Sequence, residues 1–187
     1  EPKKEGREAR NDNAGADGMP VDSEGNLYVG NFGDGVMYRM TFDENGEKKS
    51  FDKIVDDTEF TCCDGIFYDN ATDLIFINDS EENAIWVLDP NTDEIKMLWS
   101  NDDTDGTDGL LDQPAECLVR DGKLIIVNFD WSFPGLKNTA TDKPYSLSVI
   151  DLAPLGAGEA AACCDTEEAE EAPVETPVEE APSTTAG

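Results

Sequence analysis

The sequence has no histidine, few basic residues and no long apolar run. Its 187 residues include 13 Lys and Arg against 43 Asp and Glu, which gives a formal net charge of −30. This acidity argues against nucleic acid or an anionic membrane surface as a partner. No stretch is apolar and long enough to span a bilayer, and no signal peptide is recognisable. The sequence therefore predicts neither a membrane span nor a nucleic-acid-binding protein.

Cysteine is present, but its spacing does not indicate a metal site. The five cysteines are Cys62, Cys63, Cys117, Cys163 and Cys164. They form no CxxC pair, and no histidine is present to complete a zinc site. We expect Cys63 and Cys117 to be small buried hydrophobic residues, whereas the last pair is either incidental or has a redox or tethering role.

Both ends of the chain differ in composition from its middle. Residues 1–15 are charged and show no periodicity, so we expect a mobile arm. Residues 153–187 are rich in Ala, Glu, Pro and Thr and have almost no large apolar residues, which predicts a disordered acidic tail. The chain begins at Glu1 without methionine, so we expect a processed chain or a fragment.

The middle of the chain repeats one pattern three times: a short apolar run, a turn, and an apolar run that ends in asparagine. The copies are DGMPVDSEGNLYVGN at 17–31, DGIFYDNATDLIFIN at 64–78 and the looser AECLVRDGKLIIVN at 115–128. The closing asparagines Asn31, Asn78 and Asn128 are 47 and 50 residues apart, a period typical of propeller blades. We expect them to cap the loop after the second strand of each unit.

β-branched and aromatic runs between turn residues predict four short strands per unit. In the first unit these are 19–21, 27–29, 36–42 and 49–55, and Asn45-Gly46 predicts a hairpin turn before the last of them. In the second unit they are 66–68, 74–77, 84–88 and 94–99. The predicted fold class is all-β, a β-propeller with about three four-stranded antiparallel blades over residues 16–152.

Two segments interrupt the repeats. Residues 101–112, NDDTDGTDGLLD, are similar to a calcium loop, but they lack a glutamate at the twelfth position and the flanking helices of an EF-hand. A solvated loop between blades is the better interpretation. Residues 129–145 form an insertion before the closing strand at 146–152, and we expect Phe129, Trp131 and Phe133 to anchor it rather than to bind a substrate.

The residues that open the repeats are the candidate functional site. The innermost strand of each propeller blade begins near the central channel, which predicts that Asp17, Asp64 and Glu116 converge there. Carboxylates in a narrow channel repel one another unless they share a cation, and calcium is the cation that such oxygen ligands suit best. The alternative is that Asp-Gly only forms a turn that leads into the strand.

Residues 16–90 resemble the calcium-dependent six-bladed propellers of the gluconolactonase and regucalcin group. The resemblance rests on Asp17-Gly18-Met19, on Cys62-Cys63-Asp64-Gly65 and on Ile85-Trp86-Val87-Leu88-Asp89. It implies that Asp17 is a ligand of the catalytic calcium and that Asp64 is a second ligand in one alignment register. The implied activity is hydrolysis of a lactone or related ester, with calcium polarising the carbonyl and a channel carboxylate, Asp17 first, handling the proton.

The chain also departs from this family. Only three units are present. The glutamate and the asparagine that members of this family contribute from their early blades have no counterpart before Asp17. Glu116 supplies that glutamate only if the blade register is permuted. Without histidine, a carboxylate has to act as the base. We therefore expect either the C-terminal half of a longer propeller or two copies that close a ring of three blades plus three. The competing hypothesis is a non-catalytic extracellular or periplasmic β-propeller module for binding or assembly.

Overall fold

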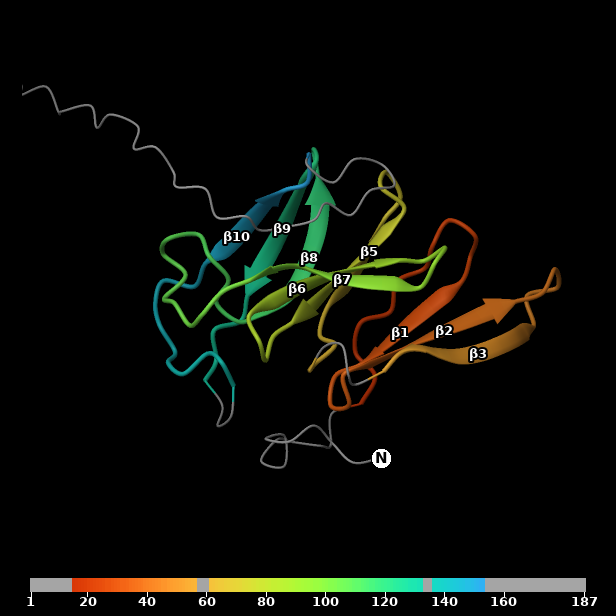
Figure 1. Ribbon diagram of the computed structural model, residues 1–187, viewed down its shortest axis with the longest axis horizontal. Helices are drawn as coiled ribbons and strands as arrows, with labels where there is room; N and C mark the ends of the chain where they lie inside the picture. Colours follow the sequence, from red (N-terminus) through yellow and green to blue (C-terminus); the bar gives the residue numbers. More distant parts are fainter. Residues whose placement is uncertain (1–14, 57–60, 133–135, 154–187) are drawn as a thin grey trace, which may run out of the picture.

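The computed structural model of the chain describes residues 15–56, 61–132 and 136–153 (Figure 1). The predicted N-terminal arm and acidic tail lie outside these residues, apart from Gly15 and Ala153. Ten strands are present: β1 (Leu27–Asn31), β2 (Val36–Phe42), β3 (Lys48–Val55), β4 (Ile66–Asp69), β5 (Leu74–Asp79), β6 (Ala84–Asp89), β7 (Glu94–Ser100), β8 (Pro114–Arg120), β9 (Lys123–Asn128) and β10 (Leu147–Asp151). No helix long and apolar enough to cross a membrane occurs in the described part of the chain.

The strands form three antiparallel sheets, one for each predicted unit. Their strand orders are β1-β2-β3, β4-β5-β6-β7 and β10-β9-β8, so each sheet is a simple meander. Figure 1 shows the β4–β7 sheet between the other two. The prediction of an all-β chain built from three antiparallel units is confirmed.

Only the middle sheet has the predicted four strands. In the first unit, the expected strand at 19–21 is reduced to two isolated bridges, Ala16 with Asn31 and Val21 with Leu27. The segment still runs beside β1, because the Pro20 carbonyl accepts a hydrogen bond from Tyr28 N at 3.0 Å. Pro20 has no N–H to donate in return, and this interrupts the ladder.

The third sheet has three strands because the described part of the insertion between β9 and β10 contains no strand. The structure describes two of the three aromatic residues that the sequence predicts to anchor the insertion, and their role as anchors stays a prediction. Phe129 and Trp131 are 46% and 56% exposed, and their rings contact each other at a centroid distance of 5.7 Å. Phe133 lies outside the described residues.

Two hydrophobic clusters hold the three sheets together. The first lies between the β1–β3 and β4–β7 sheets and contains Tyr28, Met37, Val55, Cys63, Ile66, Ile75, Ile77 and Leu88. The second lies between the β4–β7 and β8–β10 sheets and contains Leu74, Phe76, Ile85, Val87, Leu111, Cys117, Leu124, Ile126 and Leu152. Side chains alternate along a strand, so β5 supplies Ile75 and Ile77 to one cluster and Leu74 and Phe76 to the other. The prediction that Cys63 and Cys117 are buried is confirmed, and both are free thiols.

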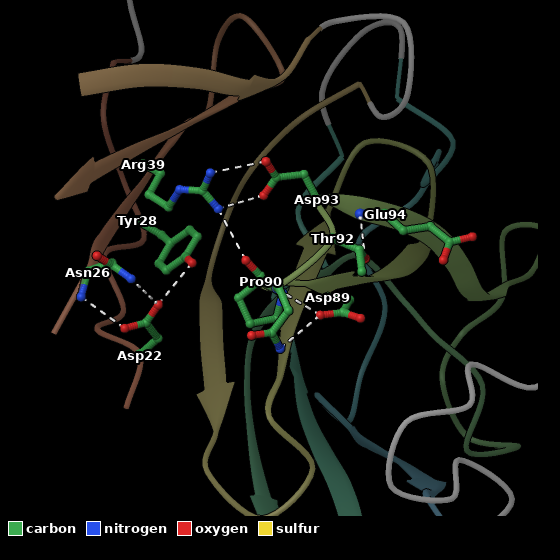
Figure 2. A network of polar contacts seen from close by, with 10 residues as sticks. Asp22, Asn26, Tyr28, Arg39, Asp89, Pro90, Thr92, Asp93 and Glu94 are labelled. Atoms are coloured by element: carbon green, nitrogen blue, oxygen red, sulfur yellow. Dashed lines mark hydrogen bonds and ion pairs between the residues drawn. The ribbon is translucent and has the colours of Figure 1, made fainter. Parts of the chain in front are cut away.

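A polar contact also joins the first two sheets, as Figure 2 shows. Arg39 on β2 forms a two-pronged ion pair with Asp93 in the β6–β7 turn, with N–O distances of 2.6 and 3.1 Å, and also donates to the Pro90 carbonyl. Beside it, the Tyr28 hydroxyl donates to Asp22 at 3.0 Å. Burial is the main reason why the pKa of Tyr28 is raised. Through its bonds to Asp93 and to the Pro90 carbonyl, the Arg39 guanidinium holds the β6–β7 turn of the middle sheet against the first sheet.

The glycines of Asp17-Gly18 and Asp64-Gly65, the Asp-Gly pairs that open the first two repeats, lie where neighbouring units touch. A Cβ at Gly18 would lie 2.8 Å from Ile66 N and 2.9 Å from the Asp64 carbonyl oxygen. At Gly65 it would lie 2.4 Å from the Ala115 carbonyl oxygen, which accepts a hydrogen bond from Gly65 N at 2.7 Å. These glycines are required for close backbone approach, so the alternative that Asp-Gly only makes a turn does not account for them.

Substitution of Gly65 by alanine is expected to destabilise the protein by about 1–3 kcal/mol, the usual range for overpacking a tight site. The neighbouring atoms include a backbone carbonyl, which cannot rotate away as a side chain can. Chemical denaturation measures the effect. Gly15→Ala is the matched control, because a Cβ there meets nothing within 4 Å. Equal stabilities of the two variants would contradict this packing.

Candidate axial carboxylate site

Asp17 and Asp64 occupy equivalent backbone positions in the first two units. Asp17 N donates to the Gly30 carbonyl and Asp64 N to the Asn78 carbonyl, each at 3.0 Å. Gly30 in the first unit therefore occupies the position that Asn78 occupies in the second. The prediction that the repeat asparagines are equivalent is therefore wrong by one residue. Asn31 pairs with Val36, the first residue of β2, whereas Asn78 pairs with Ile85, the second residue of β6.

The asparagines consequently have different roles. Asn31 caps its loop as predicted, since its Oδ1 accepts a hydrogen bond from Asp34 N at 3.3 Å. Asn78 does not: its Nδ2 donates to the Gly65 carbonyl at 2.8 Å and to Cys117 Sγ at 3.2 Å. Its Oδ1 is buried without a hydrogen-bond partner. Asn78 is thus a candidate site residue that sequence reasoning assigned to a loop cap.

The three predicted carboxylates influence one another through Asp64. Burial first, and then the charges of Asp17 and Glu116, together raise the pKa of Asp64 to about 7, while hydrogen bonds from Ser80 and the Gly65 backbone oppose the shift. The Glu116 carboxylate is held beside Gly65 and accepts a hydrogen bond from Cys117 N at 2.9 Å. One carboxylate from each unit therefore contributes to a common negative field.

Two features of this region would suit an oxygen-ligated cation. They are the negative charge around Asp64 and the buried Asn78 Oδ1, which has no hydrogen-bond partner. Among the described residues, however, no three His, Cys, Asp or Glu side chains lie close enough together to hold a metal ion. Asp17, Asp64 and Glu116 alone therefore do not form a complete calcium site, and no catalytic step follows from them alone.

Comparisons with known proteins support the fold. No protein-family model matches the sequence, and no curated protein matches it significantly. Among solved structures, a luciferin-regenerating enzyme is similar with a TM-score of 0.55 at 11% identity, over 72% of this chain and 45% of that one. The nidogen/laminin complex gives a TM-score of 0.48 at 15% identity, over 72% of this chain and 52% of that one. The PQQ domain of pyranose dehydrogenase from Coprinopsis cinerea gives 0.44 at 19% identity, over 61% and 27%.

Together with the three stacked sheets, the similarity to the luciferin-regenerating enzyme defines the chain as a partial β-propeller. The chain spans less than half the length of that enzyme. At 11% identity this likeness concerns the fold alone. Calcium binding and lactone hydrolysis therefore remain predictions.

The raised pKa of Asp64 predicts a pH-dependent stability. A carboxyl whose pKa rises from 3.8 to about 7 on folding stabilises the protein fully below about pH 4, and this stabilisation is lost as the pH rises through about 7. Asp64→Asn should therefore raise the free energy of unfolding at about pH 8 by about 1–3 kcal/mol in the absence of divalent cations. Chemical denaturation at low and high pH measures this.

The control for this prediction is Asp52→Asn, which removes one charge from an exposed position on β3. Its pH profile should follow that of the wild type. If Asp64→Asn keeps the wild-type profile as well, the carboxylate is not held in the environment described above.

Proposed function

We propose that the inner ends of the three sheets form half of a divalent-cation site, and that the intact propeller is a calcium-dependent hydrolase of lactones or related esters. The observation that supports this most directly is that the charges of Asp17 and Glu116 both act on the half-buried Asp64, and that the Glu116 carboxylate lies beside Gly65. The resemblance of Asp17-Gly18-Met19 to the gluconolactonase group supplies the substrate class.

Each site residue has a proposed role. Asp17, Asp64 and Glu116 supply negative charge, and Asn78 Oδ1 supplies a neutral oxygen ligand. When bound, calcium supplies Lewis acidity at this position. The sequence pattern favours Asp17 as the carboxylate that accepts a proton from water, which leaves Asp64 and Glu116 to hold the cation.

The outer faces of the sheet stack support the expectation of further blades. On the β8–β10 sheet, Leu118, Val127, Leu147 and Val149 are 46–59% exposed, and Leu147 lies opposite Val127 in the register. At the other end of the stack, Val21 and Phe51 are 53% and 47% exposed. Apolar faces of this kind usually belong to an interface. We propose that a second copy of the chain or further blades of a longer protein cover them.

Static light scattering distinguishes these two occupants. If a second copy closes the ring, the mass should approach twice that of the 20.3 kDa chain. Added salt should promote this association because it screens the repulsion between two acidic chains. Leu147→Glu on the exposed face should return the mass to that of one chain. A single-chain mass at all salt and protein concentrations would contradict a closed pair and leave further blades as the occupant.

The alternative function is a non-catalytic propeller module for binding or assembly, in an extracellular or periplasmic location. Two observations favour it: the described residues hold no complete metal group, and the stack has two apolar outer faces. A module of this kind would use the outer faces and the loops for contact, and it would need no cation at the axis.

Calcium titration and lactone hydrolysis test the enzymatic proposal on the full chain. Asp64→Asn should weaken calcium binding at the axis at least about tenfold, equivalent to about 1.4 kcal/mol, and should abolish any calcium-dependent hydrolysis of a simple lactone. Calorimetry and a chromogenic ester or lactone assay give the two readouts. Asp52→Asn should behave as the wild type. Wild-type protein that neither binds calcium at the axis nor hydrolyses lactones would favour the binding module.

A further inference from the structure

A second group of buried polar residues lies under the loop between the second and third sheets. Its members are Asn83, Asp112, Gln113, Asn128, Asp130 and Asn138, each 0–3% exposed. The prediction that residues 101–112 form a solvated loop is therefore only partly right. Asp105 and Asp108 are exposed, but the loop ends in the buried pair Leu111 and Asp112.

Hydrogen bonds tie this loop to the insertion and to the middle sheet. Asp112 N donates to Asn128 Oδ1 at 3.1 Å, and Gln113 N donates to Asn83 Oδ1 at 2.8 Å. From the insertion, Asn138 Nδ2 donates to Asp130 Oδ1 at 3.3 Å and to Gln113 Oε1 at 3.4 Å. The cluster is thus assembled from three separate segments rather than from one continuous loop.

Two oxygen atoms of this cluster have no hydrogen-bond partner. They are Asp112 Oδ1 and Asn138 Oδ1, on side chains that are 1% and 0% exposed. A buried polar atom without a partner is costly, so such atoms usually mark a bound water or ion. Both atoms are acceptors, which suits a cation and not an anion. Asn83 Nδ2 is also unpartnered, but it is a donor and cannot bind a cation.

The charge around Asp112 favours a cation over water. Burial first, and then the negative charges of Asp130, Asp103, Asp142 and Asp105, together raise the pKa of Asp112 to about 7. The ion pair of this region, Lys137 with Asp102 at 3.7 Å, involves a different carboxylate. A buried carboxylate surrounded by like charges is stabilised most by a positive ion placed between them.

We propose that Asp112, Asp130 and Asn138 form a calcium site that joins the 101–112 loop to the 129–145 insertion, separate from the axial carboxylates. Calcium readily takes amide and backbone carbonyl oxygens together with carboxylates. The site therefore does not need the three clustered acidic side chains that the described residues lack. It differs from an EF-hand because its ligands come from two loops. Calcium binding at this site fixes the insertion on the third sheet.

The test is the effect of CaCl2 on the thermal unfolding of the full chain at about pH 8, well above the ordinary pKa of a carboxyl group. Magnesium chloride at equal ionic strength controls for screening of the acidic surface. In an Asp64→Asn background, which weakens the axial site, calcium should still raise the unfolding midpoint. Adding Asp112→Asn or Asp130→Asn should lower calcium affinity at least tenfold. Asparagine tolerates the positive φ of 48° at residue 130.

The matched control is Asp108→Asn in the same loop, because it removes one exposed charge and its oxygen can still accept the hydrogen bond from Leu110 N. This variant should keep the calcium response. Asp112→Asn removes a buried charge and keeps the side-chain shape, so it should fold without calcium at least as stably as its parent. Equal calcium responses of Asp112→Asn and Asp108→Asn, or equal effects of calcium and magnesium, would overturn the proposal.

Discussion

The direct backbone contact between neighbouring inner strands determines the rest of the structure. Gly65 N donates to the Ala115 carbonyl at 2.7 Å, and a Cβ at Gly18 would lie 2.8 Å from Ile66 N and 2.9 Å from the Asp64 carbonyl oxygen. Because a Cβ does not fit at either glycine, the units stack closely enough for the charges of Asp17 and Glu116 to act on Asp64. The contact thus links a sequence feature, the recurring Asp-Gly pair, to the electrostatics of the candidate site.

The middle sheet shows what this stacking requires. It is covered on both faces, and β5 is accordingly buried at every position from Leu74 to Asp79. The two outer sheets each have one covered face and one face with exposed apolar residues. The same architecture therefore accounts for a stable centre and for two faces suited to further blades.

The sequence was sufficient for what depends on local pattern. The β-branched and aromatic runs predicted the strands, and Asn45-Gly46 marked a hairpin, although only Gly46 there has a positive φ and the connection spans residues 43–47. It was not sufficient where tertiary contacts decide. The role of Asn78 follows from hairpin register and from Cys117 of the next sheet. The burial of Asp112 follows from the insertion that packs against it, which spacing in a linear sequence does not reveal.

The central claim is that the charges of Asp17 and Glu116, from the units on either side, act on Asp64. The most direct test is an NMR titration that follows the side-chain carboxyl carbon of Asp64 in the wild type and in Glu116→Gln, without divalent cations. The account predicts a wild-type midpoint of about 7 that falls when the Glu116 charge is removed. A midpoint near the ordinary value of 3.8, unchanged by Glu116→Gln, would contradict it.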